Sequence, residues 1–241
     1  MVAANALSAY EVDDIDTFIM CADWLYDSQW LYRFDWVAPG YRLSAPWISS
    51  MAHGMAISAL VRASEMTRKV CYRERCRMEL ESFKADSKRG GLRSIDADGN
   101  VWYDEYPCCP HVLNGMLFAL NGLFDMGECG LSAAVLFNDG VRTILDVLPR
   151  FELNLGLFRW SRYDDRWLFW SGRKYHAVHV DQLRWLASAT GHGEFIETAN
   201  RWEGFAERYS GGVGEFAVRC ACWAIDKASR AFFRVYDKEV R

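Results

Sequence analysis

The sequence lacks several features that mark large functional classes. It has no basic excess, because 28 Lys and Arg stand against 32 Asp and Glu and give a formal net charge of −4. A general nucleic-acid binder would show the opposite balance, so we predict no nucleic-acid partner. No apolar run is long enough to cross a bilayer, and the first ten residues lack the basic start and apolar stretch of an export signal. We therefore expect no membrane span and, by default, a cytoplasmic protein.

Motifs of common catalytic machinery are also missing. The chain has no GxSxG turn, no phosphate-cradling glycine loop and no dinucleotide fingerprint, which disfavours serine hydrolases, kinases and NAD enzymes. It has neither a CxxC pair nor an HExxH motif, and His111, His176 and His179 do not form a recognisable ligand pattern. We predict no metal and no cofactor. Without an export signal, the eight cysteines are expected to be free thiols.

Apolar residues do recur at helical spacing along most of the chain. The pattern predicts helices over about 8–30, 49–65, 68–83, 111–126, 131–148, 175–190 and 194–209, with helical spacing again in 215–241. Residues 96–100 form a predicted tight turn, and 101–103 return from it as a short strand. Helix pairs joined by short turns predict an all-α fold, an α/α toroid whose ring is complete or partial, with a short β-hairpin-like excursion. We expect one domain over residues 1–241.

One stretch, residues 103–115, has the polar side chains of a candidate site. It places Glu105 beside two phenols in a short loop, and Pro107 and Pro110 make that loop rigid. The apolar segment that follows predicts a helix buried on all sides. Polar side chains held rigidly at the start of a buried helix suit a site, but they suit a satisfied structural loop as well. The aromatic segment 150–174 is the other long irregular region, and its aromatic content argues against disorder.

The predicted helix over 175–190 carries a second group of polar residues. Tyr175, His179 and Gln182 lie three or four residues apart and would share one face. Tyr175 begins the helix, where unpaired N–H groups and the positive end of the dipole favour an anion. His176 falls with Val180 on a mostly apolar neighbouring face, so we interpret it as a core histidine satisfied by a backbone carbonyl.

Five stretches in this order, at 45–58, 105–107, 113–125, 163–166 and 175–183, resemble the C-terminal domain of D-glucuronyl C5-epimerases. They read APWISSMAHGMAIS, EYP, LNG followed by GLFD, YDDR, and YHAVHVDQL. The likeness extends over about 46–205. It implies an α/α-toroid catalytic domain that epimerises carbon 5 of a uronic acid within an acidic polysaccharide such as heparosan. Full-length members of this family add N-terminal β-rich domains that complete the cleft and help dimerisation, so a homodimer is one expectation.

The resemblance also assigns site residues. The family's catalytic glutamate falls on Glu105, its two catalytic tyrosines on Tyr163 and Tyr175, and a substrate-binding arginine on Arg166. We also expect Tyr106, Asn114, His179, Arg173 and His53 to bind substrate. Epimerisation needs two proton-handling groups on opposite faces of the sugar, and a guanidinium can bind both oxygens of the uronate carboxylate while the enediolate forms.

The sequence departs from the family at several positions. His53 and Met55 stand where glutamines are usual, Cys108 and Cys109 replace small polar residues, and Asp165 stands at an ordinarily apolar position. Two alternatives therefore stay open. One is a uronate polysaccharide lyase or a glycoside hydrolase on the same fold, although a hydrolase would need two facing carboxylates. The other is a non-catalytic relative that binds an acidic glycan.

Overall fold

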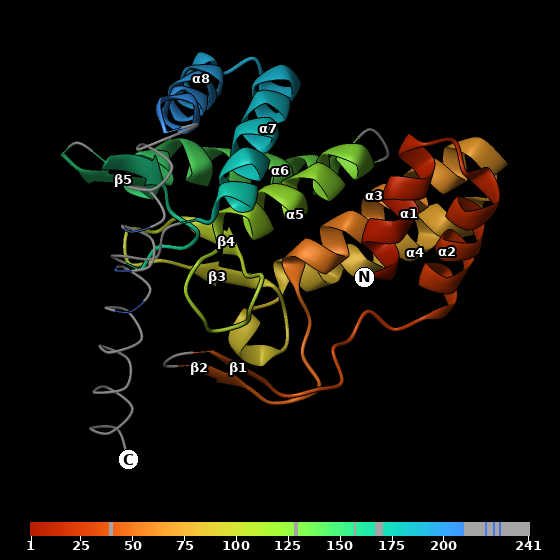
Figure 1. The fold of residues 1–241 in the computed structure, drawn as a ribbon. Helices are drawn as coiled ribbons and strands as arrows, with labels where there is room; N and C mark the ends of the chain where they lie inside the picture. Colours follow the sequence, from red (N-terminus) through yellow and green to blue (C-terminus); the bar gives the residue numbers. More distant parts are fainter. Residues whose placement is uncertain are drawn as a thin grey trace. The chain divides into compact units, whose positions relative to one another are not determined.

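A computed structural model of the chain describes residues 1–38, 41–127, 130–156, 158–166, 171–209 and the single positions 220, 224 and 227. These residues contain eight α-helices and three two-stranded sheets, which confirms the predicted mostly helical fold with small β-hairpins (Figure 1). Within them, no helix is both long and apolar enough to cross a membrane. The six cysteines among them are free thiols, as expected. The helical pattern predicted for 215–241 lies almost wholly outside the described residues.

The chain forms two compact units. The first comprises Met1–Asp35, Leu43–Cys109 and Gly115–Ile144. The second comprises Trp36–Arg42, Pro110–Asn114 and Leu145–Arg241. Each unit is described by itself below, and the expected ring of helices stays a prediction.

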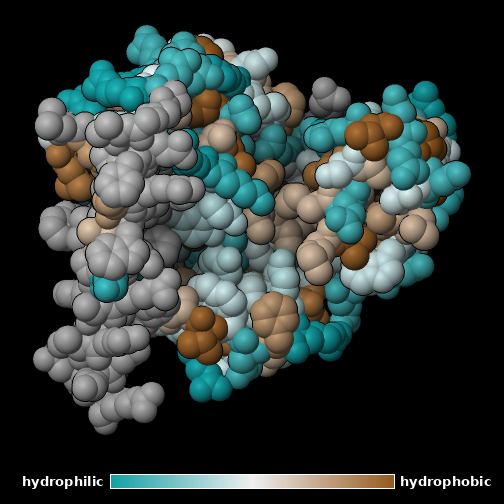
Figure 2. Space-filling model, in the orientation of Figure 1, coloured by the Kyte–Doolittle hydropathy of each residue, from teal (hydrophilic) through white to brown (hydrophobic). Residues whose placement is uncertain are grey.

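The first unit is built from helices and one hairpin. Its elements are α1 (Val2–Glu11), α2 (Ile15–Asp27), α3 (Ser50–Thr67), α4 (Val70–Lys84), the 3₁₀ turn η1 (Ser87–Arg89), β3 (Arg93–Ile95), β4 (Val101–Tyr103), and most of α5 (Leu113–Gly127) and α6 (Leu131–Val147). The predicted strand at 101–103 is β4, and it pairs antiparallel with β3. Helix α3 packs against α1, α2 and α4. On the face shown in Figure 2, apolar residues are scattered among hydrophilic ones.

The first helix differs from its prediction. Instead of one helix over 8–30, the chain forms α1 and α2, separated by a break at Val12–Asp14. Asp13 has a φ of 57°, in the left-handed region that a helix does not tolerate. The Asp14 side chain then accepts a hydrogen bond from the N–H of Thr17 and caps α2. Asp14 is therefore the N-cap of a second helix and not an interior residue of one long helix.

Helix α5 is buried on all sides, as predicted, since none of its residues is exposed. Its backbone contacts α3 directly. A Cβ atom on Gly54 would lie 2.3 Å from the carbonyl oxygen of Phe118, and one on Gly122 would lie 2.3 Å from that of Gly54. Side chains at these positions would force the two helices apart.

The second unit contains the hairpin residues Trp36–Ala38 (β1) and Tyr41–Leu43 (β2), of which Leu43 is grouped with the first unit. It continues with the 3₁₀ turn η2 (Leu148–Phe151), the antiparallel strands β5 (Glu152–Leu155) and β6 (Phe158–Ser161), and the helical pair α7 (Arg173–Thr190) and α8 (Gly193–Arg208). Strand β6 packs on both α7 and α8 (Figure 1). The segment interpreted as an irregular loop over 150–174 therefore begins with a hairpin.

Candidate functional site

Glu105 follows β4 in a loop that is tied down on both sides. The N–H of the preceding residue, Asp104, donates to the carbonyl oxygen of Leu92 at 2.7 Å. The carbonyl oxygen of Asp104 accepts a hydrogen bond from the N–H of Ser50 at 3.0 Å. Ser94 Oγ donates to the Asp104 carboxylate at 2.7 Å. These hydrogen bonds hold Asp104 next to β3 and the N-terminus of α3, so backbone contacts place Glu105.

The Glu105 side chain is only 3% exposed and packs on α5 at Gly115. Burial raises its pKa to about 7, and a hydrogen bond with Tyr106 partly opposes that rise. Among the described residues, Oε2 has no hydrogen-bond partner. A carboxyl group with a pKa near neutrality can either take or give a proton at physiological pH, which is the property of a general acid–base group.

Four aromatic residues form a cluster beside this carboxyl group. Tyr32 and Trp47 exchange backbone hydrogen bonds at 2.8 and 3.1 Å, and their rings stack with centroids 4.2 Å apart. Phe34 and Tyr106 pack against Trp47 at 5.8 and 5.9 Å. The pKa of Tyr32 is raised, first by burial and then by the negative charge of Glu105. Sequence reasoning missed Tyr32, because no local pattern links it to Glu105.

His53, predicted to bind substrate, lies in the core of the first unit. It is 2% exposed; Nδ1 lies 3.0 Å from the carbonyl oxygen of Ser49, and Nε2 lies 3.3 Å from Glu79 Oε2. Burial by itself would raise the pKa of Glu79, but the hydrogen bonds and charges of His53 and Arg75 hold it below its usual value. Both ring nitrogens of His53 are therefore engaged with protein groups that join α3 to α4.

The second unit brings the two predicted catalytic tyrosines together. The rings of Tyr163 and Tyr175 meet edge to face, with centroids 5.0 Å apart and planes at 73°. The carbonyl of Tyr163 accepts the N–H of Leu113 at 3.1 Å, which ties the 163–165 segment to 111–113. Tyr175 is 39% exposed in the first turn of α7, whose N-cap Gly172 provides no side-chain cap. N–H groups at a helix start favour a negatively charged partner, and an anion bound at this position stays a prediction.

Arg166 is held by its neighbour. Its Nε and Nη2 donate to Asp164 Oδ2 at 2.8 and 2.5 Å, and its backbone N–H donates to Oδ1 at 3.1 Å. Asp164 is 1% exposed; burial raises its pKa, and the Arg166 hydrogen bonds and charge oppose the rise. The guanidinium also lies 5.7 Å from the ring centre of Tyr41. Asp164 thus fixes the orientation of the guanidinium and balances its charge.

The remaining predicted residues of the second unit have different surroundings. Arg173 is exposed, and its Nη2 donates to the carbonyl of Tyr209 at 3.0 Å. Asn114 is buried, and its carbonyl accepts from Gln182 Nε2 at 3.3 Å. His179 is fully buried, with Nδ1 3.0 Å from Ser161 Oγ. His176 Nε2 lies 2.9 Å from the carbonyl oxygen of Trp202, which confirms that His176 is a core histidine satisfied by a backbone carbonyl.

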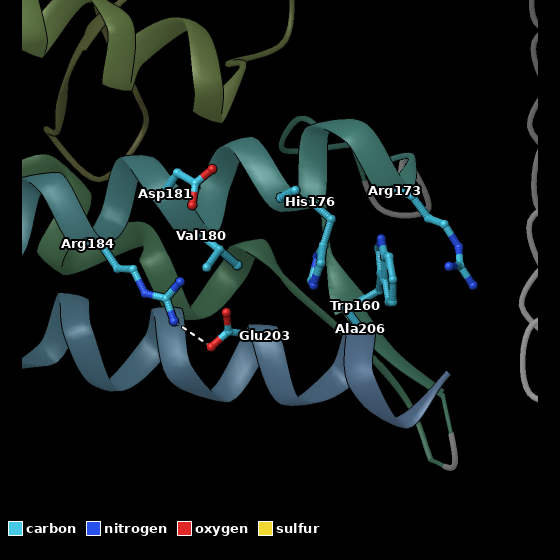
Figure 3. Close-up of a pocket in the computed structure, with 9 residues that line it drawn as sticks. Trp160, Arg173, His176, Val180, Asp181, Arg184, Glu203 and Ala206 are labelled. Atoms are coloured by element: carbon cyan, nitrogen blue, oxygen red, sulfur yellow. Dashed lines mark hydrogen bonds and ion pairs between the residues drawn. The ribbon is translucent and has the colours of Figure 1, made fainter. Parts of the chain in front are cut away.

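A pocket of about 240 Å³ lies between α7 and α8 (Figure 3). Its walls include His176, stacked 3.9 Å from Trp160, and the ion pair between Arg184 and Glu203. At 3.6 residues per turn, the lining residues Val180 and Arg184 lie on the side of α7 away from Tyr175, and His176 lies between the two faces. No predicted catalytic residue is among its described lining, so this pocket is separate from the tyrosine pair. Across the described ranges, no group of three or more His, Cys, Asp or Glu is arranged to hold a metal ion.

A buried carboxyl group with a pKa near 7 and a pair of phenols at a helix start are residue types that carry out general acid–base chemistry. The model of the D-glucuronyl C5-epimerase C-terminus family matches residues 24–204. The chain therefore belongs to the D-glucuronyl C5-epimerase C-terminal family, as the motifs at 45–58 through 175–183 predicted.

Two similar proteins extend this comparison. The D-glucuronyl C5-epimerase of Caenorhabditis elegans is 33% identical over 221 residues, which cover 78% of this chain and 35% of the relative. An uncharacterized protein of Methanocaldococcus jannaschii is 27% identical over 180 residues, covering 72% of this chain and 56% of the relative. The chain thus spans about a third to a half of the length of these relatives.

Proposed function

We propose that this chain is the catalytic domain of a uronic-acid polysaccharide C5-epimerase that converts D-glucuronate residues to L-iduronate residues. Membership of the family supports the reaction class. The observation that carries the proposal is Glu105, a buried carboxyl group whose pKa of about 7 suits proton transfer at the pH of the cell. The substrate proposed is an acidic glycan of the heparosan type, with no cofactor and with homodimer formation as part of the proposal.

In the proposed reaction, one protein group removes the proton from carbon 5 and leaves the electron pair as an enediolate on the uronate carboxyl group. A second group returns a proton to carbon 5 from the opposite face, and no other bond of the sugar changes. Glu105 is one of the two groups, and a tyrosine of the Tyr163–Tyr175 pair is the other. The second tyrosine orients the ring or relays the proton.

The barrier requires more than proton transfer. A positioned acid or base contributes a factor of about 10²–10⁴, or roughly 3–5 kcal/mol. A placed donor for the developing negative charge contributes about 3–4 kcal/mol more. Arg166, oriented by Asp164, is the proposed donor to the uronate carboxylate. Tyr106, Asn114, His179, Arg173 and His53 are the other proposed substrate-binding residues, of which Tyr106 is the nearest to Glu105.

Uptake of deuterium from solvent at carbon 5 of heparosan tests the proposal. We expect exchange with the wild-type protein and at least a hundredfold loss with Glu105→Gln and with Tyr175→Phe. Glu81→Gln is a matched control, because Glu81 is a carboxyl group of the same unit whose side chain is 71% exposed. Wild-type exchange no faster than that of Glu105→Gln would reject the activity. A product with an unsaturated sugar would indicate a lyase, and binding without exchange would indicate a non-catalytic glycan-binding protein.

A further inference from the structure

Two histidines and two serines form a buried hydrogen-bonded group in the second unit. Ser161 Oγ lies 2.8 Å from His176 Nδ1, 3.0 Å from His179 Nδ1 and 2.6 Å from Ser171 Oγ. All four residues are at most 1% exposed. Ser161 ends β6, whereas the two histidines lie three residues apart on α7. One hydroxyl group therefore connects both imidazole rings.

The contact of His176 with Trp202 determines which atoms of this group donate hydrogen bonds and which accept them. The carbonyl oxygen of Trp202 only accepts, so His176 Nε2 carries a proton and donates it at 2.9 Å. Burial lowers the pKa of His176 to about 4, so the ring is neutral at pH 7 and its Nδ1 is an acceptor. Ser161 donates two hydrogen bonds to His176 Nδ1, one from its hydroxyl at 2.8 Å and one from its backbone N–H at 3.3 Å.

The same hydroxyl then determines the state of His179. Ser161 has a single O–H hydrogen, and because His176 Nδ1 is an acceptor, the 2.8 Å contact with His176 uses it. In the 2.6 Å contact between Ser161 Oγ and Ser171 Oγ, Ser171 is then the donor, and its hydroxyl also lies 2.9 Å from the Ser161 carbonyl oxygen. Toward His179 the Ser161 oxygen can only accept, so His179 Nδ1 carries the proton. Burial, followed by the charge of His176, lowers the pKa of His179 to about 3, so no second proton is present at neutral pH. His179 Nε2 is left as a lone-pair acceptor.

This acceptor has no donor among the described residues. His179 Nε2 and Gln182 Oε1 are both buried atoms without a hydrogen-bond partner. Gln182 uses its Nε2 for the carbonyl of Asn114, so its oxygen is the atom left over. The two residues lie three positions apart, on the face of α7 that also carries Tyr175. Two buried acceptors on one face of the helix require donors, and an O–H group of a water or ligand can supply them.

We propose that Ser161 and His176 are positioning residues that hold His179 in its Nδ1-protonated form, so that His179 Nε2 and Gln182 Oε1 form an acceptor pair for an O–H donor. The donor is a buried water or a sugar hydroxyl. The sugar source rests on the proposed function, whereas the protonation state of His179 does not. His179 is one of the expected substrate-binding residues, whereas neither Ser161 nor His176 was assigned a role at the site.

Side-chain ¹⁵N NMR of the full chain at pH 7 tests the protonation state. We expect the wild-type spectrum to show His179 protonated on Nδ1 and unprotonated on Nε2. Ser161→Ala removes the acceptor of that proton, so we expect His179 to shift toward the Nε2-protonated form. Ser171→Ala is the matched control, because it removes a neighbouring buried hydroxyl group but keeps both Ser161–histidine contacts. Ser161→Thr retains the hydroxyl group and should restore the wild-type state.

The wild-type spectrum decides the matter even if Ser161→Ala does not fold. A proton on Nε2 of wild-type His179, or an unchanged His179 in folded Ser161→Ala, would overturn the proposal. A nuclear Overhauser effect from a long-lived water to His179 supports the water source. A shift of Nε2 on saturation with heparosan oligosaccharide, with about fivefold weaker binding to Ser161→Ala, supports the sugar source. Either signal supports the acceptor pair, and which of the two is seen identifies the donor. If the oligosaccharide binds neither the wild-type protein nor any variant, the proposed function fails, while the result on the protonation state of His179 stands.

Discussion

Glu105 packs directly against the backbone of α5 at Gly115. A Cβ atom on Gly115 would lie 2.4 Å from Glu105 Oε2 and 2.6 Å from Glu105 Cβ, closer than any non-bonded contact allows. The absence of a side chain at Gly115 is therefore what lets the carboxyl group lie at the start of the buried helix. This one contact links the fold of the first unit to the proposed chemistry.

Gly115→Ala should displace Glu105 and abolish most of the proposed exchange activity. Alanine is the better helix former by about 0.5–1 kcal/mol, so lost activity would come from displacement and not from a poorer helix. Gly204→Ala is the matched control, because Gly204 lies inside α8 with nothing within 4 Å of an added Cβ. We expect Gly204→Ala to stabilise the protein by about 0.5–1 kcal/mol and to leave exchange unchanged. Equal activity of the two variants would contradict the role of the Glu105–Gly115 contact.

Glu105→Gln should stabilise the folded protein at alkaline pH. The folded pKa of Glu105 is raised from 4.5 to about 7, so the ionised group disfavours folding above that pH. Below the unfolded pKa of about 4.5, Glu105 is protonated in both states and does not lower the free energy of unfolding of the wild-type protein. That free energy falls as the pH rises from about 4.5 to about 7. The full difference is about 3 kcal/mol at 1.36 kcal/mol per pH unit. Urea unfolding of both proteins between pH 4 and pH 9 measures it. A difference between the two proteins that stays constant with pH would show that the Glu105 carboxyl group is not desolvated.

Helices and their burial were largely predictable from the sequence, because apolar spacing carries that information locally. The break between α1 and α2 was not, since the apolar spacing continues through Asp13 and only its positive φ interrupts the helix. The β5–β6 hairpin was missed because its aromatic residues have no clear alternation. Its turn includes Gly156, which has a φ of 73°. Local pattern therefore predicted the elements but not every place where the backbone turns.

The candidate site was predictable only in part, for a related reason. The motifs named Glu105, and the structure gives it the buried, near-neutral carboxyl group that the chemistry needs. Tyr32 lies far from it in the chain, and only the folded first unit brings its phenol within reach of the carboxylate charge. Likewise, no pattern in the sequence around Ser161 links it to the two histidines. Its contacts with two histidines depend on how β6 packs against α7.

His53 and Glu79 provide a test of a structural role. His53→Ala should destabilise the protein by about 2 kcal/mol, because it removes the partner of a carboxylate whose side chain is only 19% exposed and empties space between Trp30 and Phe83. His53→Gln retains a donor for Glu79 and should cost less. Because the pKa of Glu79 is lowered, its stabilising contribution should be lost as the pH falls through the folded pKa. Urea unfolding at several pH values checks both points, and loss of heparosan binding by folded His53→Gln would argue instead for the substrate-binding role.

The dependence of exchange on pH should report whether Glu105 takes part in the proton transfer. If Glu105 removes the carbon 5 proton, it must be ionised while the tyrosine is protonated, and the rate of exchange should rise with pH and level off above about 7. In the reverse direction Glu105 must be protonated while the tyrosine is ionised, and this form of the protein carries the same number of protons. The D-glucuronate and L-iduronate polymers should therefore give limbs of the same direction near pH 7. Glu105→Asp keeps a carboxyl group but shortens the side chain, so it should move the limb while slowing the reaction. A profile without any limb between pH 6 and pH 8 for both substrates would show that Glu105 does not transfer the proton, and would leave the pair Tyr163 and Tyr175 to handle both faces.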